Sequence, residues 1–290
     1  MSYVAKIKKT VRTFVQPKVV TNIDVVTLPE SNLLNDRNAL ITGGTSGIGY
    51  SIAEAFIKAG ACVTITGRDS DRIVHAINEL QRKYSQACVL GVVLDNTKVE
   101  SFDSIFQKLI SDVRAKGCPP IDILVNNAGV NCKGMPNATE YEYDKVLDTN
   151  LKGVFFLSQM FGKYLIGNKI KGNILNIASS SSLRPADSAY TVSKWGVRGL
   201  TLGLAKSLAK YEITVNGLAP GPTATPMMMT EGQKDMTLQR IPLGRYIMPE
   251  EIANMATILV SSMGRAIMGD IVYMTGGAGL LTYDDVPYTF

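Results

Sequence analysis

The chain has 290 residues, 46% of them hydrophobic, and a formal net charge of +5. Five of the 30 basic residues lie in the first 20 positions, which hold no acidic residue, so the rest of the chain balances 25 basic against 25 acidic residues. This balance excludes a folded domain with the overall positive charge that is typical of nucleic-acid-binding proteins. No apolar run is long enough to span a membrane and no signal-peptide segment is evident, so we expect a soluble, non-exported protein.

Cysteine and histidine are scarce. The four cysteines, Cys62, Cys88, Cys118 and Cys132, are too few for a disulfide framework, and no CxxC pair or histidine cluster accompanies them to suggest zinc. We therefore expect reduced thiols, a cytoplasmic location and no metal site. His75, the only histidine, lies in an amphipathic helical pattern, where we expect it at the surface or in packing. A histidine-centred catalytic triad is thereby excluded.

The chain divides into three parts by composition. Residues 1–35 form a basic extension and linker, residues 36–278 one folded domain, and residues 279–290 a C-terminal tail. Apolar residues recur at helical spacing in the extension, which is compatible with an anionic surface or, preferably, with a subunit-packing arm. The aromatic tail docks either on a neighbouring subunit or on its own subunit, and the sequence leaves both alternatives open.

From Asn38 onward, short apolar runs alternate with longer helical patterns. This alternation predicts right-handed β–α–β crossovers and a parallel sheet covered by helices on both faces. The predicted strands are 39–41, 62–65, 89–94, 121–125, 173–177, 214–216 and 271–274. The sequence therefore predicts a single-domain, doubly wound α/β fold with a seven-stranded parallel sheet.

The first predicted strand runs into a glycine-rich turn and then a helical pattern over 50–59. Glycines permit a positive φ and let backbone N–H groups approach a pyrophosphate, which then lies at the positive end of the helix. The spacing, Gly-x3-Gly-x-Gly, differs from both GxGxxG and the P-loop. We expect nucleotide binding by Gly43, Thr45, Ser46, Gly47, Ile48 and Gly49.

Several further motifs follow in order: Asn126-Asn127-Ala128-Gly129, Asn150, the serines 179–182, Tyr190-Thr191-Val192-Ser193-Lys194, and Pro220-Gly221. With the glycine turn, this ordered set resembles the classical short-chain dehydrogenase/reductases over about residues 36–277. The resemblance implies a Rossmann-type fold, agreeing with the strand count, and a dinucleotide across the carboxyl ends of the strands.

The end of the second strand bears on the choice of coenzyme. By alignment with the family, Gly67 occupies the position of the acid that selects NAD, and Arg68 follows it, where a guanidinium pairs with a 2′-phosphate. Some NADP-dependent members carry an extra basic residue inside the glycine turn, where this chain has Ser46. The Asp69 carboxylate also competes with a 2′-phosphate for Arg68. NADP is therefore favoured, with NAD as the alternative. Asp95 and Asn96 resemble the adenine-binding positions, although spacing alone equally allows a capping aspartate.

The resemblance assigns further roles residue by residue. Asn127, Ala128 and Gly129 support the coenzyme ribose and the sheet. Asn150 distorts its helix and binds a water that links Lys194 to solvent, with a plain helix cap as the alternative. The far side of the coenzyme is held by Pro220, Gly221, Thr223 and Thr225.

Tyr190 and Lys194 lie four residues apart, which on a helix places both side chains on one face. A nearby cation favours phenolate, so we expect the lysine to lower the pKa of the tyrosine. By resemblance Ser179 polarises the substrate oxygen. The loop between Ser179 and Tyr190 is shorter than is common in the family, so Ser181 remains an alternative to Ser179.

The combined prediction is an oxidoreductase that transfers a hydride between NADP(H) and a carbonyl or secondary alcohol. The segments 240–245 and 249–252 resemble 3-oxoacyl-[acyl-carrier-protein] reductases, which suggests a 3-oxoacyl thioester. The alternatives are an NAD-dependent sugar, polyol or hydroxysteroid dehydrogenase and, disfavoured by the intact motifs, a non-catalytic dinucleotide sensor. A methionine-rich segment, 227–236, resembles the family's substrate lid. Apolar helical stretches at 151–164 and 192–211 predict a homotetramer.

Overall fold

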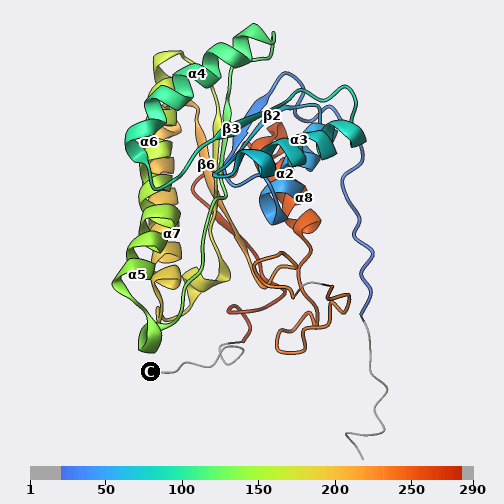
Figure 1. Cartoon of the computed structure of the whole chain (residues 1–290), viewed down its shortest axis with the longest axis vertical. Coiled ribbons are helices and arrows are strands. Elements are labelled where there is room, and N and C mark those ends of the chain that lie inside the picture. Colours follow the sequence, from blue (N-terminus) through green and yellow to red (C-terminus); the bar gives the residue numbers. More distant parts are fainter. Residues whose placement is uncertain (1–20, 231, 283–290) are drawn as a thin grey trace, which may run out of the picture.

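The computed structural model describes residues 21–230 and 232–282. Figure 1 shows a central sheet between two layers of helices, with α2, α3 and α8 on one face and α4, α5, α6 and α7 on the other. This three-layer arrangement is the doubly wound α/β fold that the alternating sequence pattern predicts.

The sheet has seven strands in the order β3-β2-β1-β4-β5-β6-β7, and every neighbouring pair is parallel. Their bounds are β1 (Asn38–Ile41), β2 (Cys62–Gly67), β3 (Val89–Val93), β4 (Ile123–Asn126), β5 (Asn173–Ile177), β6 (Thr214–Pro220) and β7 (Ile271–Met274). The predicted strand count and direction are confirmed. Several bounds differ by one or two residues, and the largest difference is at β6, which continues four residues beyond its predicted end to Pro220.

The helices are α2 (Gly47–Lys58), α3 (Ser70–Lys83), α4 (Phe102–Ala115), α5 (Glu140–Leu147), α6 (Gly153–Gly167), α7 (Ala189–Leu208) and α8 (Pro249–Val260). Their starts follow ordinary capping chemistry: Ser188 accepts a hydrogen bond from Thr191 N at the start of α7, and Pro249 is the first residue of α8. A π-helical turn, Asp148–Lys152, separates α5 from α6. His75 is exposed on α3, as predicted.

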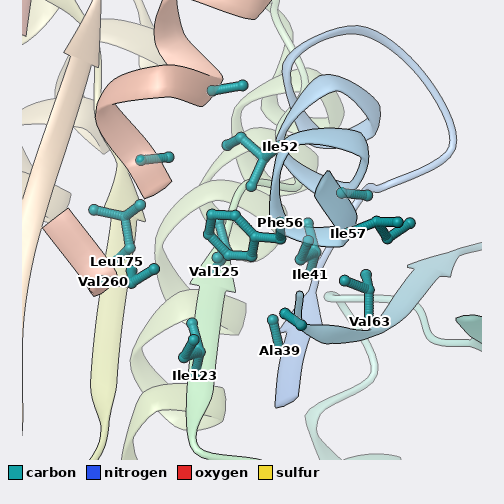
Figure 2. Close-up of a cluster of buried hydrophobic side chains, with 14 of the residues drawn as sticks. Ala39, Ile41, Ile52, Phe56, Ile57, Val63, Ile123, Val125, Leu175 and Val260 are labelled. Atoms are coloured by element: carbon teal, nitrogen blue, oxygen red, sulfur yellow. The ribbon is translucent and has the colours of Figure 1, made fainter. Parts of the chain in front are cut away.

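The hydrophobic core lies on both faces of the sheet. Figure 2 shows the cluster on the α2 side, where Phe56 and Ile52 lie beside Ile41, Val125 and other strand side chains. Phe56 is completely buried, and removing an aromatic ring from such a position typically costs about 3–5 kcal/mol. This packing fixes α2, and with it the glycine turn that precedes the helix.

Buried amides tie the sheet to the helices on its other face. Asn126 Nδ2 donates to Ser158 Oγ on α6 (2.9 Å) and to Asn176 Oδ1 on β5 (2.8 Å). Asn176 Nδ2 in turn donates to Thr201 Oγ1 on α7 (2.9 Å). Because a buried polar group without a partner is costly, this chain of hydrogen bonds specifies how β4, β5, α6 and α7 fit together.

The folded body begins earlier than the predicted boundary at residue 36. Leu34 is fully buried in the core, and Leu28 N donates to Asn254 Oδ1 on α8 (3.0 Å). Further out, the hydroxyls of Thr21 and Thr237 lie 2.6 Å apart. The predictions for residues 1–20 and for the tail beyond residue 282 lie outside the described residues. Within the described part of the chain, no helix is both long and apolar enough to cross a membrane.

Candidate active site

A cavity of about 900 Å³ opens at the carboxyl ends of the parallel strands. In a doubly wound sheet this edge is where ligands bind, next to the point at which the strand order reverses. Here β1 lies between β2 and β4, so the reversal falls beside the β1–α2 turn. Most of the predicted site residues line the cavity, namely Gly43, Thr45, Ser46, Gly47, Ile48, Arg68, Asp95, Asn96, Asn127, Ala128, Gly129, Ser179, Tyr190, Lys194, Pro220, Gly221, Thr223 and Thr225.

The glycine turn has the conformation that its sequence predicts. Gly43 and Gly47 have φ angles of +64° and +54°, in the left-handed region that favours glycine. Asn127 Nδ2 donates to the carbonyl oxygens of Thr42 (2.9 Å) and Gly43 (3.0 Å), so the amide at the end of β4 holds the turn in place. Asn127 therefore supports the turn through hydrogen bonds to backbone, and its predicted role toward the coenzyme ribose stays a prediction.

Gly49 is predicted to bind the coenzyme, but it does not line the cavity. A Cβ at this position would lie 2.4 Å from both Asn127 Nδ2 and Gly43 O. The residue is glycine because α2 passes too close to the turn and to β4 for any side chain. The structure shows close packing at Gly49, and its predicted contact with the coenzyme stays a prediction.

The start of α2 offers backbone donors to the cavity. Ser46 is the N-cap residue, yet its side chain makes no capping hydrogen bond, and the first helical turn contains no acidic residue. The first N–H groups of a helix lack intrahelical acceptors and lie at its positive end. An anionic group such as a pyrophosphate fits this position.

Two arginines border the cavity at the end of β2. Arg68 and Arg72 both line it, whereas the Asp69 carboxylate caps α3 by accepting from Asp71 N (2.9 Å) and Arg72 N (3.2 Å). A Cβ at Gly67 would already lie 3.1 Å from Thr45 Cγ2. Arg72 is not among the residues predicted from the sequence, although its spacing from Arg68 across a predicted helix start was the available signal.

Asp95 and Asn96 lie at the end of β3. Asp95 Oδ1 accepts from the backbone N (3.0 Å) and the hydroxyl (2.9 Å) of Thr97, which closes a local turn. It does not cap a helix, because the helical turn that follows, Val99–Ser101, has Lys98 at its N-cap. Asn96 is buried, and its Nδ2 has no hydrogen-bond partner among the described residues. An unpaired buried donor that lines a cavity fits a polar ligand such as a dinucleotide.

Asn150 lies in the π-helical turn and is almost fully buried. Its side chain accepts from Val130 N (2.8 Å) and donates to Val130 O (2.9 Å) and to Ser193 Oγ (3.2 Å). The predicted distortion of the helix is present. Asn150 does not line the cavity, and its amide joins the loop after β4 to α7 one residue before Lys194. Its predicted link to Lys194 through a water stays a prediction.

Ser179, Tyr190 and Lys194 meet at the inner wall of the cavity. Ser179 follows β5, and its hydroxyl lies close enough to Tyr190 on α7 to act on the pKa of the phenol. The Ser179 hydroxyl also accepts from Ser181 N (3.1 Å). Lys194 Nζ lies 5.6 Å from the centre of the Tyr190 ring. Of the two candidate serines, Ser179 is the one whose hydroxyl acts on the pKa of the tyrosine.

The electrostatics of this group differ from the prediction. Burial raises the pKa of Tyr190 above its usual value, while the neighbouring Ser179 hydroxyl acts in the opposite direction and only partly offsets it. Burial also lowers the pKa of Lys194 to about 8. The expected lowering of the tyrosine pKa by lysine is thus not observed, because desolvation is the larger effect for both groups.

The opposite wall comes from the loop after β6. A Cβ at Gly221 would lie 2.7 Å from Thr275 O, and Thr223 Oγ1 donates to Gly221 O (2.9 Å). Thr225 packs beside Gly47, with its Cγ2 3.3 Å from a Cβ built there. This loop therefore closes against the glycine turn. Met227 and Met228, which line the cavity and are 53% and 40% exposed, follow directly.

A helix N-terminus without a side-chain cap faces this cavity from one side, and a tyrosine beside a buried lysine faces it from the other. Together with the doubly wound sheet, they define the class of oxidoreductases that bind a nicotinamide dinucleotide. The sequence model described as short chain dehydrogenase matches residues 37–236, and the chain belongs to this family. It is accordingly an NAD(P)-dependent oxidoreductase that acts on CH–OH groups.

Individual relatives show a range of substrates. A 3alpha-hydroxysteroid dehydrogenase from Mediterraneibacter gnavus is 33% identical over 251 residues, covering 85% of this chain and 98% of the relative. A 3-ketoacyl-(acyl-carrier-protein) reductase from Brucella melitensis, solved with NADH, is 30% identical, with a TM-score of 0.75 and 85% and 100% coverage. A short chain dehydrogenase from Burkholderia cenocepacia, solved with NADP, is 28% identical, with a TM-score of 0.75 and 85% and 99% coverage.

Proposed function

We propose that this protein reduces a carbonyl group with NADPH, using Tyr190 as the proton donor. The placement of Tyr190 beside Ser179 in the cavity wall, with the buried Lys194 Nζ 5.6 Å from the centre of its ring, carries this proposal. A raised pKa keeps the Tyr190 hydroxyl protonated at neutral pH, which is the form that donates a proton. The arrangement therefore favours carbonyl reduction at neutral pH, with alcohol oxidation as the reverse of the same path.

When bound, the coenzyme supplies a hydride to the carbonyl carbon. Tyr190 gives its proton to the carbonyl oxygen as negative charge develops there, and the Ser179 hydroxyl donates a hydrogen bond to the same oxygen. Lys194, held by a 2.8 Å hydrogen bond to Ile177 O, lies close enough to the Tyr190 ring to stabilise the phenolate that remains. Asn150 keeps α7 in register with the loop after β4.

The end of β2 supports NADPH over NADH. An acidic side chain that binds the adenosine ribose would have to begin at Gly67, where a Cβ is already tight against Thr45. Arg68 and Arg72 instead bring two guanidinium groups to this part of the cavity. Guanidinium groups pair strongly with phosphate, so we assign Arg68 to the 2′-phosphate and Arg72 as a second positive charge.

For the substrate we propose a 3-oxoacyl thioester. The segments that suggested this class, 240–245 and 249–252, are joined by a two-pronged ion pair between Arg245 and Glu251, with both N–O distances 2.8 Å. Arg240 lines the cavity and precedes this pair. The alternative is an NAD-dependent sugar, polyol or hydroxysteroid dehydrogenase. Among these, the adaptable methionines beside the cavity favour the hydroxysteroid, because it is a rigid apolar substrate.

A substrate panel with both reduced coenzymes tests these assignments. We expect the highest kcat/KM with NADPH and a 3-oxoacyl thioester, and loss of that activity in Tyr190→Phe. Oxidation of a hydroxysteroid or polyol with NAD at a higher kcat/KM would replace the thioester assignment. A protein that binds either dinucleotide but turns over no carbonyl compound in the panel would support the sensor alternative.

We also propose that the protein is a cytoplasmic homotetramer. Large apolar side chains are exposed on α6 and α7, among them Phe155 (45%), Trp195 (42%) and Leu202 (50%). Monomeric proteins rarely leave such side chains together on neighbouring helices. Pairing these helices across two-fold axes would remove them from water.

A further inference from the structure

Three of the four cysteines meet in space although they are far apart in the sequence. The sulfur atoms of Cys62, Cys88 and Cys118 all lie within 4.8 Å of one another. Each of these residues is partly exposed. The sequence spacing gave no sign of the cluster, because the fold alone brings the three positions together.

The register of the sheet explains the meeting. Val63 pairs with Val89 in the parallel ladder, and Val63 N donates to Cys88 O (2.9 Å), which places Cys62 and Cys88 side by side at the beginnings of β2 and β3. Residues beside each other in a parallel ladder point to the same face of the sheet. Cys118 reaches this face from the end of α4, where its N donates to Val113 O (3.1 Å).

A polar side chain accompanies the sulfurs. Asn38 is the ladder partner of Cys62 on β1, and its Nδ2 donates to Pro119 O (2.8 Å), one residue after Cys118. Asn38 is completely buried, and its Oδ1 has no hydrogen-bond partner among the described residues. Buried acceptors are normally paired, so an acceptor left over beside three thiols calls for a ligand or a bound water as its partner.

We propose that Cys62, Cys88 and Cys118 bind a zinc ion, with a water as its fourth ligand and Asn38 Oδ1 as the acceptor for that water. Thiolates are the ligands that zinc and other soft metal ions prefer. With zinc–sulfur bonds of about 2.3 Å, tetrahedral geometry places the sulfur atoms about 3.8 Å apart. The observed cluster reaches this arrangement by side-chain adjustments of about 1 Å at most.

The site is distinct from the coenzyme cavity. Its cysteines lie at the amino edge of the sheet, whereas the cavity lies at the carboxyl edge, and none of the three residues lines the cavity. In Figure 1 the C-terminal end of α4 marks this amino edge, at the top of the molecule. A metal ion here joins β2, β3 and the segment after α4, and so acts as a structural clip.

The test uses the full-length protein, reduced and freed of metal with a chelator. We expect one equivalent of Zn²⁺ to bind in competition with a chromophoric chelator, and Co²⁺ to give the intense sulfur-to-cobalt absorption of thiolate ligation. Cys88→Ser should weaken binding at least 100-fold, whereas Cys132→Ser, which alters the cysteine outside the cluster, should leave affinity unchanged. Equal affinities of these two variants, or no thiolate absorption in the wild type, would overturn the proposal.

A second measurement needs no variant and so does not depend on how Cys88→Ser folds. Zinc should protect Cys62, Cys88 and Cys118 from alkylation by iodoacetamide, while Cys132 reacts at the same rate with and without the ion. Mass spectrometry of the labelled peptides identifies each thiol. Alkylation rates of the three clustered thiols that do not change with zinc would exclude the site.

Discussion

Lys194 Nζ lies 5.6 Å from the centre of the Tyr190 ring, and its hydrogen bond goes instead to the carbonyl oxygen of Ile177, at 2.8 Å. The carbonyl contact fixes the lysine side chain, and burial lowers its pKa to about 8. A neutral amine can still donate this hydrogen bond. Desolvation is therefore the main cause of the pKa shifts of both Tyr190 and Lys194 in the free protein, and the lysine loses its charge at a lower pH than usual.

This relationship predicts how stability depends on pH. Between about pH 8 and the usual lysine pKa of about 10.4, the unfolded chain binds a proton that the folded chain lacks, so the Lys194 contribution to stability rises with pH. In denaturant unfolding at pH 7, 8 and 9, wild type should gain stability relative to Lys194→Met as pH increases. A difference between the two proteins that is constant over this range would contradict the lowered pKa.

Tyr190→Phe should reduce kcat by at least about 100-fold, since general acid catalysis commonly contributes about 10²–10⁴-fold. Coenzyme affinity should stay within about twofold, because the ring remains and only the proton donor is lost. Tyr211→Phe, at an exposed tyrosine beyond α7, serves as the control. Residual activity within about tenfold of wild type, roughly 1.4 kcal/mol of barrier, would remove Tyr190 from the central role.

Arg68→Ala should lower kcat/KM for NADPH by about tenfold or more and leave that for NADH nearly unchanged, because only NADPH carries the 2′-phosphate. Arg82→Ala changes an arginine on α3 that is paired with Glu79 and does not line the cavity, so it controls for lost surface charge. Steady-state kinetics with both coenzymes decide the matter. A higher kcat/KM with NADH than with NADPH in the wild-type protein would refute the assignment of Arg68 to the 2′-phosphate.

Two glycines provide a matched test of the packing around the turn. Gly49→Ala should destabilise the fold by about 1–3 kcal/mol and weaken coenzyme binding, because its Cβ would lie 2.4 Å from Asn127 Nδ2 and from Gly43 O. Gly203→Ala places a Cβ in open space within α7, where alanine typically stabilises a helix by about 0.5–1 kcal/mol. Denaturant midpoints measure both. Equal effects of the two changes would show that the close approach at Gly49 is unimportant.

The exposed apolar side chains of α6 and α7 lead us to expect a particle of four chains in solution. Light scattering at micromolar concentration should give about four times the 31.4 kDa chain mass. Replacing Phe155 and Leu202 together by glutamate should reduce this mass. A stable 31.4 kDa species in the wild type would rule out the assembly.

The fold was predictable because a parallel sheet buried on both faces leaves short apolar runs that are easy to find, as in 173–177. Glycine positions and the order of motifs located the cavity. Three features could not be predicted: the pKa directions, the close packing at Gly49, and the Cys62–Cys88–Cys118 cluster. Each depends on burial or on distances between segments that are remote in the chain, and neither can be predicted from local sequence patterns.

The π-helical turn Asp148–Lys152 also limits how the length of the chain can vary. An α-helix turns by about 100° per residue, so deleting one codon within this turn would rotate α5 by about that angle relative to α6. Val146, buried on α5, would leave the core, and the anchor between Asn150 and Val130 would be lost. By contrast, Gly117 lies in a turn with open space around it. We therefore expect natural insertions and deletions at that turn and a constant length from the Thr139 cap of α5 to Gly167 at the end of α6.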